Sequence, residues 1–228
     1  SISQDGPGTT ILGGNNNHLG DLILTSGTVV IASDASLGQL TSLHLDPGSV
    51  LDASAMTAPV ALTQTDIISV HGTLIGDLDV SDDLFGSGFI DGNLTALDGT
   101  VHPDFDSMFD IGGDFTLTSP GTISFEIDGD VPQSEFNRMR VIGAVNLTGN
   151  LDLNSLSADI PPSASGTLVL LLNDGSDPIN GTFTNYAEGA LISLPNDPFQ
   201  RSLQVTYLAN GDGGPVGNDF GVTIVGEG

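Results

Sequence analysis

The chain has 228 residues, of which 38% are hydrophobic, so it can bury a sizeable core. Three basic residues, all arginines, stand against 29 acidic ones. The formal net charge of −26 argues against a nucleic-acid partner and against binding to an anionic membrane surface, because both need clustered Lys and Arg. The lack of cysteine excludes a disulfide framework, a zinc-thiolate site and a cysteine nucleophile.

Short runs of alternating apolar and polar residues, separated by turn residues, recur along the chain, and helical spacing is nearly absent. In chain order the clearest runs are DLILTSGTVVI (21–31), SLHLDPGSVLD (42–52), IISVHGTLIG (67–76), NLTALDGTVH (93–102) and DFTLTSPGTISFEI (114–127). Each run is broken once by a glycine, and these glycines are Gly27, Gly48, Gly72, Gly99 and Gly121, with a degenerate copy at Gly149. The sequence therefore predicts many short strands.

The spacing of the copies predicts how the strands are arranged. Adjacent turn glycines are 21, 24, 27, 22 and 28 residues apart, with no helix between them. Such a period indicates the coils of a parallel β-solenoid, in which the inward Leu, Val and Ile side chains of neighbouring coils stack. We interpret each copy as one corner and two faces of one coil. The glycine is expected at the corner because the chain bends sharply there and often needs a positive φ.

The pattern changes at about residue 150, which predicts two regions: β-helix repeats over 1–150 and a C-terminal β-rich cap over 151–228. GTLVLLLNDG (166–175) is a continuous apolar run of the kind found in strands buried on both faces. Shorter apolar runs follow at irregular intervals. We expect a small antiparallel sheet or β-sandwich that covers the last coil, since an open end would expose apolar side chains and unpaired backbone groups.

Several segments carry a family resemblance, among them GSGFIDGNLTALDGTVHPD, GGDFTLTSPGTISFEIDGD, FNRMRVIGAVNLTGNLDLNSL and GTLVLLLNDGSDPINGTF. Over about residues 86–225 the chain resembles the C-terminal portion of bacterial autotransporter-associated β-strand repeat proteins. The resemblance implies a right-handed parallel β-helix outside a bacterial cell, with an adhesin-like role and no catalytic residues. The segment HPDFDSMFD (102–110) departs from the family's usual turn, so a local insertion or binding loop is expected there.

Histidines and paired carboxylates are the first candidates for chemistry. His44, His71 and His102 lie four before, one before and three after the turn glycine of their copies, which predicts no common row and argues against a histidine metal site. HG (71–72) and SDD (81–83) resemble fragments of the constellation in pectin-degrading β-helix hydrolases, but in reversed order. The lyases of that fold usually need a basic residue, and this chain has no lysine. The sequence predicts no enzyme.

Calcium is the strongest ligand hypothesis, because three loops combine carboxylates with turn residues. The candidate ligands are Asp104, Asp106 and Asp110 in the first loop, Asp174 and Asp177 in the second, and Asp212 and Asp219 in the third. None of these loops has the spacing of an EF-hand, and the alternative is a solvated acidic surface. Arg138 and Arg140 alternate along one run, so both are expected on one face, stacking or pairing with nearby aspartates.

Three classes of function remain open at this stage. A non-enzymatic structural or adhesive module of the extracellular space or bacterial cell surface is favoured by the repetition and by the high Ser, Thr, Asn and Asp content. A carbohydrate-binding or carbohydrate-cleaving β-helix and an ice-binding solenoid are the alternatives. The chain starts at Ser1 without a signal-like segment, which predicts an excised piece of a longer protein. The segment SISQDGPGTTILGGNNNHLG (1–20) has few apolar residues and no evident capping element, so we expect the first coil to be covered by preceding coils of a longer protein or by a second copy that joins head-to-tail into filaments. An extracellular polysaccharide is the other partner expected.

Overall fold

The computed structural model describes residues 1–14, 16, 19–33, 35, 37, 39–62, 67–153, 160, 166–174, 177–194, 199–211 and 217–226. This part of the chain consists of strands and turns without a helix, so the predicted all-β class is confirmed. Nowhere in these ranges does a helix long and apolar enough to cross a membrane occur.

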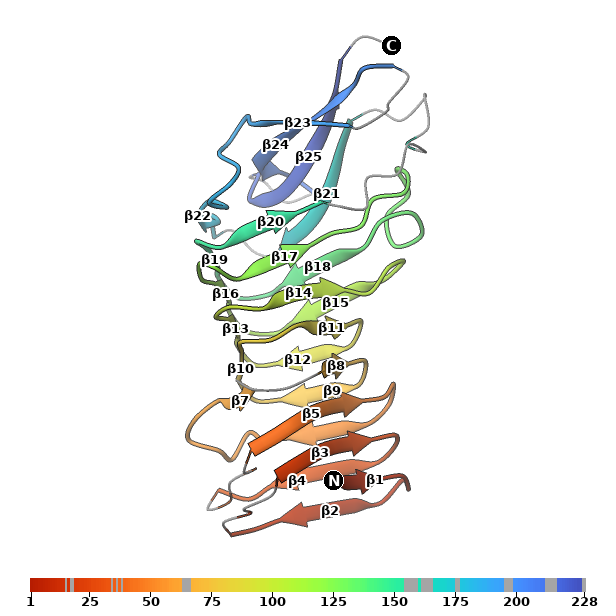
Figure 1. Cartoon of the computed structure of the whole chain (residues 1–228), viewed down its shortest axis with the longest axis vertical. Helices are drawn as coiled ribbons and strands as arrows, with labels where there is room; N and C mark the ends of the chain where they lie inside the picture. The colour runs from red at the N-terminus through yellow and green to blue at the C-terminus, as the bar shows by residue number, and fades with distance from the viewer. Residues whose placement is uncertain are drawn as a thin grey trace.

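The strands form three long sheets that the chain visits in turn (Figure 1). The first sheet contains, in spatial order, β1 (Ile2–Gln4), β3 (Leu19–Leu24), β5 (Gln39–Leu45), β8 (Ile67–Val70), β11 (Leu84–Gly86), β14 (Thr100–Pro103), β17 (Thr122–Ser124) and β20 (Asn150–Asp152). The third sheet contains β7 (Val60–Leu62), β10 (Leu78–Val80), β13 (Leu94–Ala96), β16 (Phe115–Leu117), β19 (Val145–Leu147) and β22 (Asn180–Gly181).

The second sheet is the longest, because it continues beyond the coils. Its parallel part contains β2 (Thr9–Leu12), β4 (Thr28–Ile31), β6 (Val50–Asp52), β9 (Thr73–Ile75), β12 (Phe89–Asp91), β15 (Met108–Ile111), β18 (Arg138–Val141) and β21 (Gly166–Asn173). Three antiparallel strands follow: β25 (Asp219–Val225), β24 (Ser202–Ala209) and β23 (Leu191–Ser193).

The parallel register stacks apolar residues directly over one another. In the first sheet successive partners are Ile2, Leu22, Leu43, Ile68, Leu84, Val101, Ile123 and Leu151, so successive coils contain 20, 21, 25, 16, 17, 22 and 28 residues. Every member of this ladder after Ile2 is buried. Parallel sheets linked by short corners are consistent with a β-solenoid, as the spacing of the repeats predicted.

The repeat itself differs from its sequence-based interpretation. Gly27 and Gly72 precede strands of the second sheet, whereas Gly99 and Gly149 precede strands of the first sheet. The glycine phrase therefore marks two different corners. The 27-residue spacing between Gly72 and Gly99 contains an extra short coil, made of β11, β12 and β13, which the sequence reading missed.

Glycine is needed at the corners for two reasons. Gly27 and Gly48 have φ values of 76° and 84°, as expected, and a Cβ on Gly27 would also lie 2.2 Å from the Gly6 carbonyl oxygen. The later corner glycines are needed because the coils approach closely: a Cβ on Gly99 would lie 2.2 Å from backbone atoms of Asp82, and one on Gly149 would lie 2.4 Å from the Gly121 carbonyl oxygen.

The C-terminal strands extend the second sheet instead of forming a separate one. Strand β21 pairs in parallel with β18 on one edge and antiparallel with β25 on the other. The predicted boundary at 150/151 falls inside β20, a strand of the first sheet. Phe183, Tyr207 and Phe220 pack together at this end, with ring centroids 4.9 Å apart for Phe183–Phe220 and 5.2 Å for Tyr207–Phe220.

Candidate functional site

An outward row of side chains crosses the first sheet at mid-height. His44, Ser69, Phe85 and His102 are successive partners in strands β5, β8, β11 and β14. The Phe85 and His102 rings stack with their centroids 4.6 Å apart and their planes 5° from parallel. This distance matches the ~4.8 Å spacing of neighbouring strands, so the two rings stand one above the other on consecutive coils.

His71 lies outside this row, so the three histidines form no common row, as predicted, but His44 and His102 share one, which was not expected. The offsets were measured from turn glycines that lie at different corners, so they could not be compared. His44 and His102 are nevertheless three coils apart, about 14 Å at the usual strand spacing, which is too far for one metal ion.

Beside this row, His71 contacts a carboxylate across a whole coil. Val70, Gly86 and Pro103 are successive partners, so His71, Ser87 and Asp104 occupy the next position on three coils. The His71 Nε2 atom lies 2.8 Å from Asp104 Oδ2, and its Nδ1 atom lies 3.1 Å from Ser69 Oγ. The His71 and Asp104 side chains are both about 30% exposed.

We call Ser69, His71, Phe85, His102 and Asp104 the outward cluster. It combines an exposed aromatic ring with a hydroxyl, two imidazoles and a carboxylate, on a face where Phe85 is 40% exposed. These groups can donate and accept hydrogen bonds beside an apolar surface. Sequence reasoning missed Ser69 and Phe85, because their proximity depends on the short coil.

The first predicted calcium loop is largely committed to other contacts. Asp110 accepts two hydrogen bonds from Arg140, at 3.0 Å from Nε and 3.1 Å from Nη2, as the predicted pairing of the arginines with aspartates requires. Asp104 contacts His71. Asp106 has a φ of 60° in the turn that joins β14 to β15, which is only four residues long. The larger insertion lies one coil later, at 125–137.

The second and third calcium loops meet in space. Asp219 is fully buried and accepts hydrogen bonds from the backbone N–H groups of Asn173 (2.8 Å) and Gly211. The side-chain amide of Asn173 donates to the Asp177 carbonyl, and its Oδ1 atom is buried without a hydrogen-bond partner. Asp174 and Asp177 are exposed, whereas Asp212 lies outside the described residues.

Charges around these loops are partly balanced. Burial lowers the pKa of the Arg138 guanidinium below its usual value, and the nearby negative charge of Asp219 opposes part of that shift. Arg138 Nε also donates to the Val169 carbonyl at 2.9 Å. No group of three or more His, Cys, Asp or Glu side chains in the described ranges is arranged to hold a metal ion.

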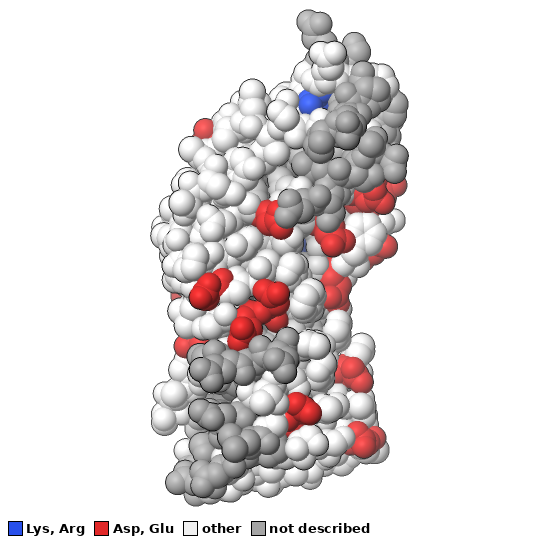
Figure 2. Space-filling model, viewed as in Figure 1, with Lys and Arg blue, Asp and Glu red and all other residues white. Residues whose placement is uncertain are grey.

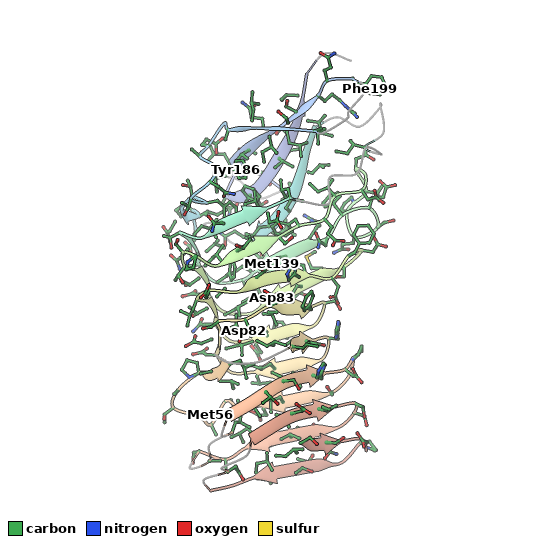
Figure 3. The ribbon with its side chains drawn as sticks, in the orientation of Figure 1. Met56, Asp82, Asp83, Met139, Tyr186 and Phe199 are labelled. Atoms are coloured by element: carbon green, nitrogen blue, oxygen red, sulfur yellow. The ribbon has the colours of Figure 1, made fainter. Side chains whose placement is uncertain are left out.

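The fragments that resemble a pectin-hydrolase constellation are at different corners. Asp82 and Asp83 lie between β10 and β11, where the chain enters the first sheet (Figure 3). His71 lies where the chain leaves that sheet. Asp83 Oδ1 accepts a hydrogen bond from the backbone N–H of Thr100 at 2.9 Å, so it stabilises the corner of the next coil.

Acidic side chains are dispersed over the molecular surface. Figure 2 shows acidic residues as separate groups on the viewed face, from the lowest coils to the C-terminal part, with other described residues between them. The chain matches no protein-family model and no curated protein. The resemblance to autotransporter-associated repeat proteins therefore stays a prediction.

Proposed function

We propose that the chain is a non-enzymatic structural or adhesive module of the bacterial cell surface or extracellular space. The observation that carries the proposal is the inward ladder of the first sheet, which continues from Leu22 to Leu151 without a polar interruption. A core filled by stacked Leu, Ile and Val leaves the outward faces and the ends for interactions. Such a module provides an elongated scaffold whose outer surface can bind other molecules.

The proposed coil is right-handed and closed by a C-terminal cap. Right-handed winding is supported by the general preference of parallel β-strand crossovers, about 98% of which have this hand. The cap is supported by the antiparallel strands β23 to β25 and by the aromatic group of Phe183, Tyr207 and Phe220, which is buried next to the last coils.

The absence of enzyme activity is part of the proposal, although Ser69, His71 and Asp104 are linked as in a hydrolase relay. A serine nucleophile also needs donors for the developing oxyanion. Strand β8 pairs with β5 on one edge and β11 on the other, so its backbone amides are engaged within the sheet. We therefore assign these side chains to binding.

Self-association is proposed at the first coil. Among the described strands, β1 pairs with β3 and β2 pairs with β4, and the second edge of each has no described partner, which supports pairing with another β element there. An added strand from a second copy would continue both sheets and repeat without closing, which makes a filament. Light scattering and negative-stain images should show particles longer than one chain. A strictly monomeric chain would contradict this part of the proposal.

A calcium ion is proposed at the two C-terminal loops, through Asp174, Asp177, Asp219 and Asp212. The hydrogen bond from the Asn173 N–H to Asp219, which joins the second loop to the third, supports this placement; Asp212 lies outside the described residues. Millimolar calcium should then raise the melting temperature more than sodium chloride does at the same ionic strength. An equal rise with both salts would assign the effect to screening of the −26 charge and refute the site.

The surface role is tested on intact cells of the source organism. An antibody against the purified chain should label the cells without permeabilisation, and deletion of the gene should weaken attachment to neighbouring cells or to a polysaccharide-coated support. Labelling that requires permeabilised cells would contradict the proposed location. Cleavage of a polysaccharide by the purified chain would contradict the non-enzymatic role.

A further inference from the structure

The outward row of the first sheet has one position where a ring is missing. His44, Phe85 and His102 carry rings, whereas Ser69, between His44 and Phe85, carries only a hydroxymethyl group. One face of the Phe85 ring contacts His102, and the opposite face is directed toward the level of Ser69. Phe85 is accordingly 40% exposed, which is a high fraction for a phenylalanine on an ordered strand.

The register sets the size of this open position. His44 and Phe85 are two coils apart, about 9.6 Å at the usual strand spacing, with Ser69 halfway between them. A ring held over Ser69 would lie about 4.8 Å from the levels of both neighbours. The Phe85–His102 stack has a centroid distance of 4.6 Å, so one further ring fits the same spacing.

The sides of the position differ in polarity. Ile67 lies two residues before Ser69 on the same face of β8 and is 47% exposed, so it adds an apolar side. His71 lies on the other side, 3.1 Å from Ser69 Oγ, and is held there by Asp104. Both His71 ring nitrogens are engaged in these contacts, so the polar group left for a ligand is the Ser69 hydroxyl. The position therefore offers an apolar ring face and an apolar flank together with a hydroxyl.

We propose that the position over Ser69 binds one neutral sugar ring of a polysaccharide, stacked on Phe85. A pyranose has an apolar C–H face, which matches the Phe85 ring, and a rim of hydroxyl groups, which matches the Ser69 hydroxyl. Uronates and other anionic sugars are disfavoured by Asp104 and by the net charge of −26. The proposal deepens the adhesive role, because it names what the surface would attach to.

The test is NMR titration of the full chain with cellotetraose, a neutral β-linked glucose oligomer. We expect saturable shifts at the Phe85 ring and the Ser69 amide with a Kd of about 1 mM, because a single ring offers little contact area. Tetragalacturonate, the anionic probe, should shift them at least about tenfold less strongly. Phenol serves as an aromatic probe of the same face.

Two variants and one control make the test specific. Ser69→Phe should fill the position with a ring of the chain itself, and Phe85→Leu should keep an apolar side chain while removing the ring face; each should weaken cellotetraose binding at least about tenfold. Thr95→Phe makes the same kind of outward change in the third sheet and should leave binding unchanged.

Three results would overturn the proposal: no shift at Phe85 and Ser69 with about 20 mM cellotetraose, equal binding by Phe85→Leu and the unsubstituted chain, or binding of phenol without cellotetraose. Surface labelling of intact cells is unaffected by these outcomes. The sugar site and the surface role can therefore fail separately.

Discussion

Tyr207 connects the last coils to the antiparallel strands at the C-terminal end. Its hydroxyl donates to the Tyr186 carbonyl at 2.6 Å and accepts from the backbone N–H of Phe183 at 2.9 Å. Burial raises the pKa of this phenol to about 12; the hydrogen bond from Phe183 opposes the shift, and the charge of Glu188 adds to it. A single side chain thus satisfies two backbone groups in an apolar setting.

We predict that Tyr207→Phe lowers the free energy of unfolding by about 1–3 kcal/mol at pH 7, because it leaves the buried Phe183 N–H without its acceptor. Urea unfolding measures this. Tyr186→Phe is the control, since it removes the other phenol and keeps the carbonyl that accepts the bond. Equal stability of Tyr207→Phe and the unsubstituted chain would contradict the assignment.

The same residue predicts the direction of a pH effect. The phenol ionises near pH 10 in the unfolded chain and at about 12 in the folded one, so between these values the folded state binds more protons. The stability due to this group is therefore complete below pH 10 and is lost as the pH rises to 12. The Tyr207→Phe variant should lack this part of the loss of stability at alkaline pH. An identical dependence of stability on pH in the variant and the unsubstituted chain would refute the effect.

At the residue scale, the sequence predicted some contacts and missed others for a definite reason. The pairing of an arginine with an aspartate was foreseen and is found between Arg140 and Asp110. The His71–Asp104 contact was not foreseen, because its partners are 33 residues apart and meet only when two successive coils have 16 and 17 residues. The assumed period of 21 to 28 residues placed them at unrelated positions.

Among the elements, the corner between the second and third sheets is the most regular. A glycine followed by Asp or Asn occurs at 76–77, 92–93 and 113–114. Each side-chain oxygen accepts the backbone N–H of the next coil: Asp77 from Asn93, Asn93 from Asp114, and Asp114 from Ala144, all at 2.8 Å. The corner is thus a ladder of side-chain to backbone hydrogen bonds along the stack.

The glycines of this corner are expected to be intolerant of any side chain. A Cβ on Gly92 would lie 2.2 Å from the Gly76 carbonyl oxygen, so the coils would have to separate. Gly92→Ala should cost about 1–3 kcal/mol or more in thermal or urea unfolding. Gly13→Ala is the matched control, since no atom lies within 4 Å of its Cβ, and it should stay within about 0.5 kcal/mol. Equal losses would disprove the close approach.

The hydrogen-bond ladder is tested by a pair of substitutions at one position. Asp114→Ala removes the acceptor for the Ala144 N–H and should lower stability by about 0.5–1.5 kcal/mol. Asp114→Asn should retain most of the stability, because it keeps an acceptor oxygen. It also reduces the negative charge of the chain. If Asn is as destabilising as Ala, the bond does not stabilise the corner.

The strands themselves were largely predictable, because alternation of apolar and polar residues marks them directly. The runs at 21–31 and 67–76 each correspond to two strands joined at a glycine corner. The Gly–Asx pairs, which mark the corner between the second and third sheets in each short coil, were the available signal for the missed coil. The C-terminal strands were recognised as strands, but their joining to the second sheet depends on long-range pairing that no local pattern encodes.

For the whole molecule, the account depends on coils that stack in register. The outward residues Asp79, Thr95 and Thr116 are successive partners in β10, β13 and β16 of the third sheet. Neighbouring coils place such residues about 4.8 Å apart, and coils two steps apart place them about 9.6 Å apart. The chain has no cysteine, so engineered pairs report this arrangement without interference.

Disulfide formation between engineered cysteines therefore tests the stacked coils most directly. A disulfide needs Cα atoms about 4.4–6.8 Å apart, so the Asp79→Cys/Thr95→Cys pair should cross-link under mild oxidation, as should Thr95→Cys/Thr116→Cys. The Asp79→Cys/Thr116→Cys pair, which is two coils apart, should remain reduced and is the matched control. Cross-linking of that control pair together with failure of both neighbouring pairs would contradict the register of the coils. It would also contradict the outward row of the first sheet, on which the proposed sugar binding depends.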